Sequence, residues 1–505
     1  MNAPFMRIAR AGIGLLALAG CAVGPDFHTP EPPKATRYTA EPLPEHTASA
    51  TTVGGTAQAF NPSATLPADW WTLFHSPELD SLVRQAITDS PSLAAAQAAL
   101  RSAQLLQRAE AGALFVPGVD AGANALRQHE PGYLFGEPLA PSVTYNLYSA
   151  NANVSYRLDL FGGSRRLYES YRAQTDYQRA ELEAAYIALT ANIVTAAINE
   201  ASLRGQLAEL DGVIANERAV LKVVERQFEA GGASRTDVLA QRAQLAQTEA
   251  TIPALHKALA QTRNQLAVLS GRTPDRGDIP QFTLEQFTLP ESLPVSVPSE
   301  LVRQRPDIQA AEALLHQASA EVGVATANMY PQIDLTASLG VSSLAVHSIF
   351  SKGNELWSVG GSLTQPLFHS GELLNKKRAA EANFDQAFAT YREVVLSGLG
   401  DVANVLLALE NDADALQAQA DAEAAAKATF ELAQKQYHVG GVSYLTILNA
   451  EREYDLARQA RVQAAATRYA DTAALFLALG GGWWNAPAQA SASHASGTPP
   501  ADSAH

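Results

Sequence analysis

Residues 227–234 read QFEAGGAS, and residues 436–443, 209 positions further along the chain, read QYHVGGVS. At the same offset, LAVLSG at residues 266–271 is matched by LFLALG at residues 475–480. A repeat of this length is too long for a solenoid unit, so it indicates that a whole structural half was duplicated. We therefore expect a two-fold internal repeat, in which two copies of one unit build the protein.

The segments that flank each Gly-Gly pair are predicted to be very long helices. Residues 164–229 contain no proline, and their apolar residues follow the alternating three- and four-residue spacing of a packed helical seam. The second copy is expected at residues 372–439, and each long helix is followed by a return helix that ends near residue 266 or 479. Such helices would extend roughly 100 Å, which fits a rod or a tube better than an ordinary globule. The seam positions of the first helix are Leu203, Leu207, Leu210, Ile214, Leu221, Val224 and Phe228, with Glu217 as the one exception.

Segments between the helices show the alternation of a two-faced strand. Residues 154–160, 333–341 and 356–364 alternate apolar with polar or small side chains. About ten alternating residues suit a strand of a membrane barrel, although a half-buried soluble sheet shows the same pattern. The N-terminal leader described next, and the lack of an evident transmembrane helix, favour the barrel. Four strands from one chain cannot close a membrane barrel, because unpaired edges cannot stand in hydrocarbon, so several chains must share it.

The N-terminus predicts secretion followed by lipidation. Two arginines precede a short apolar run at residues 11–19, which is typical of a signal peptide and too short to span a bilayer. The run ends in Leu18-Ala19-Gly20-Cys21, which resembles the bacterial lipobox, where the cysteine is acylated and becomes the first residue. Cys21 is the only cysteine of the chain, and Ala22 stands where inner-membrane lipoproteins typically carry Asp. These features point to an anchor in outer-membrane lipid.

Composition excludes several classes of function. The formal net charge of −15 argues against nucleic acid as a partner, since that would require clustered basic residues. The chain contains no HExxH, CxxC, Walker or Gly-x-Ser-x-Gly motif, and its histidines are scattered. We therefore expect no enzyme activity, no metal site and no cofactor.

The patterns divide the chain into six segments. Residues 1–20 are the signal peptide, residues 21–76 the lipidated cysteine with an extended arm, and residues 271–300 a proline-rich connector. Residues 77–270 and 301–480 are the two repeats, each with a helix, two barrel strands and a long helical hairpin. The first of these helices is expected at residues 77–111, and ordered structure is expected to begin at Trp70. In the C-terminal segment 481–505, the tail is expected to be disordered.

Four motifs resemble the lipoprotein outer membrane factors of the TolC/NodT type. They are VGPDF at residues 23–27, LDLFG at 158–162, LVRQRPDI at 301–308 and ALGGGW at 478–483. The motifs follow the order of that family and cover nearly the whole chain, so the chain is identified as a member.

The resemblance implies a mainly α fold combined with a membrane β-barrel. In this family a homotrimer closes a twelve-stranded outer-membrane barrel from four strands per chain, and a long α-helical barrel continues it into the periplasm. The implied function is the exit duct of a tripartite efflux pump that passively conducts drugs or other small molecules. Its implied partners are a periplasmic adaptor (a membrane fusion protein) and an inner-membrane transporter of the resistance-nodulation-division class.

Two alternative functions remain open at this level. The same fold would serve type I polypeptide secretion or metal-ion export, and the cargo cannot be read from the duct. A purely structural coiled-coil lipoprotein is the other alternative, although it would not need the alternating strands.

The resemblance also implies a periplasmic gate at the turns that contain the Gly-Gly pairs. Tyr437 matches the aromatic residue before the second turn, and Leu445 matches an apolar constriction residue. Asn449 falls where many members carry an aspartate that pairs with an arginine, and Arg452 matches the basic position. Because asparagine carries no charge, its contact with Arg452 should be weaker than an ion pair. The corresponding first-half turn contributes two further candidates, Arg235 and Asp237.

Overall fold

A computed structural model of the chain describes residues 22–131, 133–134, 137–138 and 141–485. The predicted signal peptide, Cys21 and the tail beyond residue 485 lie outside the described residues. The chain forms two compact units, and each unit draws on both halves of the sequence. Of the described residues, unit one contains residues 22–30 together with Leu100–Gln178 and Ala311–Tyr391, and unit two contains Glu31–Ala99, Arg179–Ala310 and residues 392–485.

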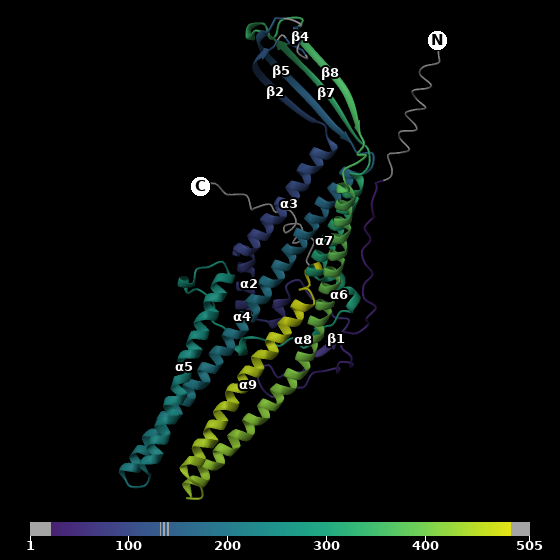
Figure 1. Ribbon diagram of the computed structural model, residues 1–505. Helices are drawn as coiled ribbons and strands as arrows, with labels where there is room; N and C mark the ends of the chain where they lie inside the picture. Colours follow the sequence, from purple (N-terminus) through teal and green to yellow (C-terminus); the bar gives the residue numbers. More distant parts are fainter. Residues whose placement is uncertain (1–21, 132, 135–136, 139–140, 486–505) are drawn as a thin grey trace. The chain divides into compact units, whose positions relative to one another are not determined.

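Unit one contains a four-stranded antiparallel sheet with the order β2-β5-β7-β8 (Figure 1). The strands are β2 (Gly118–Glu130), β5 (Val143–Leu158), β7 (Gln332–Ser343) and β8 (Glu355–Thr364). A two-stranded pair, β3 (Tyr133–Leu134) and β4 (Glu137–Pro138), lies between β2 and β5 in the sequence, and the turn η4 (Val346–Ser348) lies between β7 and β8. The strands predicted at residues 333–341 and 356–364 are thereby confirmed.

The first-half strand ends earlier than its alternation suggested. β5 stops at Leu158, so Leu160 belongs to the turn that leads into the next helix, α4 (Gly163–Glu229). The Asp159 carboxylate accepts hydrogen bonds from the backbone N–H groups of Ser164 and Arg165, at 3.1 and 3.0 Å. These contacts satisfy donors of the first helical turn, which has no intrahelical acceptors for them. The last two residues of the predicted strand, Asp159 and Leu160, therefore belong to the turn that leads into a helix instead.

The helix expected at residues 77–111 is instead two helices, α2 (Pro77–Asp89) and α3 (Pro91–Phe115). Ser90 separates them with an extended backbone at ψ 121°. The residue before a proline is disfavoured in the helical region, and Pro91 has no N–H with which to continue the ladder. The prediction of one helix was wrong because it overlooked this proline.

The predicted helical hairpins are confirmed in both halves. α4 and α8 (Glu372–His438) each have 67 residues, and their return helices α5 (Arg235–Leu269) and α9 (Tyr444–Ala478) each have 35. Gly231 and Gly440 follow the long helices with φ of +77° and +79°, a left-handed conformation that glycine adopts without strain. Among the described residues, α4 alone is long and apolar enough to cross a membrane, but 56% of its most apolar window is buried, as in a core helix.

The arm and the connector pack together in unit two. β1 (Ala59–Asn61) pairs in parallel with β6 (Ser292–Pro294). Ordered structure therefore begins earlier than Trp70, the position at which we expected it to begin. Gln58 is fully buried, and its side-chain amide donates to the backbone oxygen of Pro290 at 2.9 Å and to Thr472 at 3.1 Å. The buried guanidinium of Arg468 in α9 donates to the Gly54 carbonyl oxygen at 2.8 Å. The other short elements of this unit are η1 (Trp70–Phe74), η2 (Pro274–Arg276), η3 (Leu284–Gln286), α6 (Pro298–Gln304) and η5 (Trp483–Asn485). The remaining α-helix, α7 (Pro306–Ala327), begins in unit two and continues into unit one.

Candidate functional site

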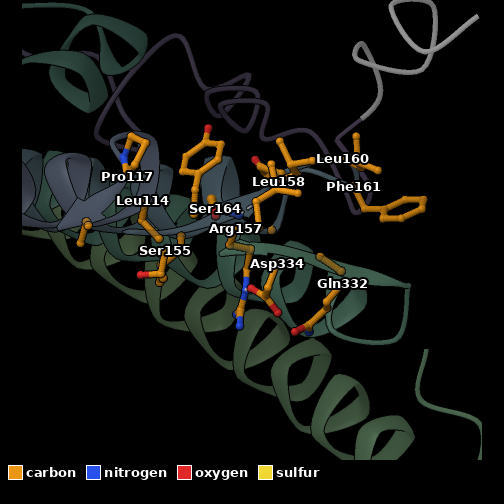
Figure 2. A pocket seen from close by; sticks show the side chains of 18 of the residues that line it. Leu114, Pro117, Ser155, Arg157, Leu158, Leu160, Phe161, Ser164, Gln332 and Asp334 are labelled. Carbon is orange, nitrogen blue, oxygen red and sulfur yellow. Dashed lines mark hydrogen bonds and ion pairs between the residues drawn. The ribbon is translucent and has the colours of Figure 1, made fainter. Parts of the chain in front are cut away.

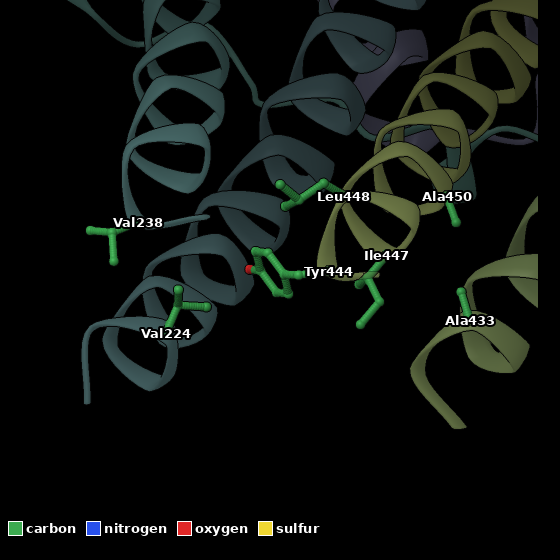
Figure 3. Packing of buried hydrophobic residues seen from close by; sticks show 7 residues of the cluster. All are labelled: Val224, Val238, Ala433, Tyr444, Ile447, Leu448 and Ala450. Carbon is green, nitrogen blue, oxygen red and sulfur yellow. The ribbon is translucent and has the colours of Figure 1, made fainter. Parts of the chain in front are cut away.

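The helical tip of unit two is the first candidate site. We use "the tip" for the turns at residues 230–234 and 439–443 and the helix ends that flank them. Seven buried residues from α4, α5, α8 and α9 pack together there (Figure 3), namely Val224, Val238, Ala433, Tyr444, Ile447, Leu448 and Ala450. This cluster joins the first hairpin to the second.

Two tyrosines of the second hairpin donate hydrogen bonds to the first. Tyr437 donates to Gln227 of α4 at 3.3 Å, and Tyr444 donates to Gln241 of α5 at 2.7 Å. The two rings lie 5.7 Å apart in an edge-to-face arrangement. Burial raises the pKa of Tyr444, so its hydroxyl stays protonated and remains a donor. The gate prediction included Tyr437 but missed Tyr444, which begins the seam of α9.

The structure places three predicted gate residues together on an exposed face of α9. Leu445, Asn449 and Arg452 follow one another at intervals of four and three residues, which is helical spacing for one face. Leu445 is 58% exposed, and both polar residues are exposed as well. Within the part of the chain that the structure describes, Asn449 and Arg452 make no side-chain hydrogen bond or ion pair.

The two first-half candidates have different surroundings. Asp237 closes a capping box at the start of α5, where its carboxylate accepts from the Ser234 backbone N–H at 2.8 Å, and the Ser234 hydroxyl accepts from the Asp237 backbone N–H at 3.2 Å. Arg235 is exposed at the first position of the helix. Asp237 therefore has a structural partner already, and Arg235 is available to solvent.

The sheet of unit one has one apolar and one polar face. Because side chains alternate along a strand, directly paired residues share a face. Two rows of paired residues define the apolar face, Val119–Val154–Ala337–Val359 and Ala121–Ala152–Leu339–Trp357. The neighbouring row, Asp120–Asn153–Ser338–Ser358, defines the polar face, on which Arg157 also forms an ion pair with Asp334 at 2.8 Å.

The apolar face is uncovered in the single chain. Leu339 is 64% exposed, Trp357 75% and Val359 76%. A contiguous apolar surface of this kind is typical of a region that contacts lipid or another chain. The outer strands β2 and β8 are each paired on one side only, so the sheet has two open edges.

A cavity of about 720 Å³ lies in unit one where the helices meet the sheet (Figure 2). Leu114, Leu158 and Phe161 contribute apolar surface, while the Arg157–Asp334 ion pair contributes charge. The described residues contain no group of three or more His, Cys, Asp or Glu side chains that could hold a metal ion.

The segment that follows Cys21 is held firmly on unit one. The backbone N–H of Val23 donates to the Phe161 oxygen at 3.0 Å, and Arg166 forms an ion pair with Asp26 at 2.6 Å. The Phe27 ring stacks on His316 with centroids 4.3 Å apart. A Cβ atom at Gly24 would lie 2.5 Å from the Gly323 backbone, so only glycine permits this close crossing.

Comparisons with known proteins agree with this architecture. The family model described as "Outer membrane efflux protein" matches residues 82–272 and 297–481. The pyoverdine export outer membrane protein OpmQ of Pseudomonas aeruginosa is 31% identical, over 82% of this chain and 87% of that protein. The toluene efflux pump outer membrane protein TtgF of Pseudomonas putida is 30% identical, over 94% of this chain and 96% of that protein.

Solved structures give the same result. The outer-membrane channel OprN superposes with a TM-score of 0.82 at 30% identity, over 92% of this chain and 100% of that chain. The open-state MtrE outer membrane channel of Neisseria gonorrhoeae superposes with a TM-score of 0.77 at 28% identity, over 92% and 99% of the two chains. The family predicted from the motifs is confirmed, and the chain belongs to the outer membrane efflux protein family.

Proposed function

We propose that this protein is the outer-membrane exit duct of a tripartite efflux pump. It passively conducts drugs or other small molecules that an inner-membrane transporter of the resistance-nodulation-division class delivers through a periplasmic adaptor. The observation that carries the proposal is the two-faced, open-edged sheet in a chain of this family. Relatives named for pyoverdine export and for toluene efflux support small molecules as the cargo, rather than polypeptides or metal ions.

The open edges support a shared barrel. In hydrocarbon every backbone N–H and C=O group must be paired, so β8 of one copy would pair with β2 of the next. Two copies would give eight strands, whose interior is just filled by side chains. Three copies would give twelve strands and leave a lumen lined by the polar face, while the apolar face meets lipid.

The gate and the anchor complete the proposal. In a trimer, three copies of Leu445 would surround one axis at the tip and form an apolar ring that water and ions cross poorly. Asn449, Arg452 and Arg235 would contact neighbouring helices, while Tyr437 and Asp237 hold the turns in place. Acylated Cys21 would add a lipid anchor to the barrel, with residues 22–29 fixing the point where the anchor leaves the protein.

Efflux from intact cells tests the duct function. Cells that express the partner transporter and adaptor should accumulate more of a fluorescent pump substrate when this protein is deleted, and wild-type protein should restore low accumulation. Val359→Pro should not restore it, because proline removes a donor from the edge strand β8 that the next copy would need. Val359→Ile, which keeps the backbone donor and an apolar side chain at the same position, is the matched control and should behave as wild type. Unchanged accumulation on deletion, together with no conductance from the purified protein, would refute the proposal.

A further inference from the structure

The seam between the two hairpins contains buried carboxyl groups that the duct function does not use. Glu217, the one exception in the apolar seam of α4, is fully buried, and Glu451 of α9 is 3% exposed. Glu451 and Asp455 continue the three- and four-residue spacing of Tyr444 and Leu448, so both lie on seam positions of α9. Acidic side chains are almost never fully buried without a partner, so this placement needs a physical account.

Each buried glutamate has one satisfied and one unsatisfied oxygen. Oε1 of Glu217 accepts from the Thr248 hydroxyl at 3.0 Å, and Oε1 of Glu451 accepts from the Asn216 amide at 2.6 Å. Oε2 of both residues is buried and makes no hydrogen bond within the described part of the chain. Only the Glu451 contact crosses from the second hairpin to the first, whereas Glu217 contacts α5 of its own hairpin. Glu217 nevertheless lies close enough to Glu451 and Asp455 of α9 to repel both of them.

Among the described residues, neither glutamate forms an ion pair, because the nearby arginines are paired with other acids. Arg458 of α9 forms an ion pair with Glu209 of α4, and Arg218 of α4 forms an ion pair with Glu249 of α5. Arg461 of α9 is bonded to Glu423 of α8. Apart from the partners already named, the groups that affect the pKa values of the seam residues are acidic or neutral. They are Asp455, Asp237, Gln244, Tyr437 and Tyr444.

Burial and mutual repulsion favour the protonated acids. Burial, followed by repulsion from Asp455 and Glu217, raises the pKa of Glu451 to about 7. Burial, with repulsion from Glu217 and Glu209 and partly offset by attraction to Arg458, raises the pKa of Asp455 to about 7. Burial also raises the pKa of Glu217. A protonated carboxyl can donate through its hydroxyl, whereas two neighbouring buried carboxylates would repel each other in a poorly solvated seam.

We propose that Glu217, Glu451 and Asp455 form a proton-operated lock between the α4–α5 hairpin and the α8–α9 hairpin. When the three groups are protonated the seam packs tightly, and when they ionise the hairpins separate and the tip opens more readily. The lock rests on the proposed duct function, because the lock controls whether the gate of the duct is open or closed. It would make the duct close in mildly acidic surroundings and open more easily above neutral pH.

The direction of the pH dependence follows from the linkage between proton binding and packing of the seam. A carboxyl whose pKa is higher in the packed seam than in water binds its proton more tightly there, so packing is favoured at low pH. That stabilisation is present below the ordinary pKa of 4.5 and is lost as pH rises to about 7. Each proton released can shift the opening equilibrium by up to about tenfold per pH unit within this window.

The test measures opening and seam packing separately. Full mature protein in planar bilayers should show resting conductance that rises about tenfold or more between pH 5.5 and 8.5. Glu217→Gln with Glu451→Gln should keep conductance low and greatly reduce its rise with pH, because the amides mimic the neutral acids and leave only Asp455 to ionise. Glu453→Gln, which changes an exposed acid on the same helix, is the matched control and should retain the wild-type response.

Hydrogen exchange gives the second measurement. After correction for the chemical exchange rate, amide protection at residues 210–221 and 447–458 should fall from pH 5.5 to 8.5 in wild type and in Glu453→Gln. It should fall far less in the double variant, in which only Asp455 can still ionise. If the double variant does not fold, Glu451→Gln alone should reduce the pH response at least severalfold. A double variant with the wild-type pH response, or wild-type protection that is flat with pH, would overturn the lock. Wild-type protein without conductance at any pH would instead refute the duct function, and the exchange data would still judge the lock.

Discussion

At the scale of the residue, the faces of α9 separate two roles. The buried face carries Tyr444 and Glu451, which hold the hairpins together, and the exposed face carries Leu445, Asn449 and Arg452. Helical spacing could have revealed both faces, because Tyr444, Leu448, Glu451 and Asp455 continue one heptad pattern. The pattern was missed because carboxyl groups are ordinarily assigned to solvent, and only packing shows that Glu451 is buried and Asp455 partly buried.

The exposed face leads to a prediction about the closed gate. Leu445→Ser should raise resting conductance in planar bilayers, because it removes an apolar barrier from each copy around the axis. Arg452→Ala should raise it less, because the hydrogen bond from the Arg452 guanidinium to the uncharged Asn449 of a neighbouring helix is weaker than an ion pair. Arg218→Ala, at an exposed mid-helix ion pair with Glu249, is the control and should change little. If both gate variants conduct as wild type, the constriction lies elsewhere, and Asp237 would be tested next.

Cys21 supports a second prediction at this scale. Cys21→Ser should abolish acylation and lipoprotein processing, since the thiol is the only group that can carry the lipid in the lipobox-like sequence. Mass spectrometry of the purified mature protein should find a lipidated N-terminal cysteine in wild type and none in the variant. Efflux should survive in part, because a closed barrel anchors itself in the membrane. A mature wild-type chain that begins elsewhere and carries no lipid would exclude this processing.

At the scale of the element, boundaries depend on local backbone chemistry that periodicity does not report. The Gly-Gly turns and the long helices were predictable, because a missing proline over more than sixty residues and a repeated turn sequence leave few alternatives. The break at Pro91 could also have been predicted from the proline itself, which the periodicity alone does not report. The early end of β5 could not, since the capping carboxylate of Asp159 starts a helix within an uninterrupted alternating pattern. The pairing of β1 with β6 joins segments far apart in the sequence, which no local pattern reveals.

The two turns provide a matched pair for a stability prediction. Ser234 caps α5 with its side chain, whereas Ser443 occupies the same position before α9 and makes no side-chain bond to the helix backbone. Ser234→Ala should therefore destabilise the first turn of α5 by about 0.5–2 kcal/mol, and Ser443→Ala should cost clearly less. Hydrogen exchange at residues 236–241 and 445–450 would measure both. Equal losses in the two variants would show that the capping box does not hold the first-half turn.

At the scale of the whole molecule, the single chain leaves interactions unmade that only assembly can supply. The sheet has open edges at β2 and β8, and its apolar face exposes Leu339, Trp357 and Val359. The open edges are not stable in a membrane, since unpaired backbone groups cost several kcal/mol each in hydrocarbon, whereas the apolar face requires lipid or another chain to cover it. From the sequence, the strand count already required several chains, and the number of chains came from resemblance to a family.

Trimeric assembly is therefore the prediction on which the duct depends. Native mass spectrometry of the detergent-solubilised protein should show three chains as the main species, because three four-stranded sheets close a barrel that retains a lumen. Val359→Pro should shift the protein toward monomer, because the β8 edge then offers a weaker partner for β2 of the next copy. Glu453→Gln, on an exposed helix surface, should leave the trimer unchanged. A stable wild-type monomer as the main species would remove the shared barrel, and with it the ring of Leu445 that would close the duct at the tip.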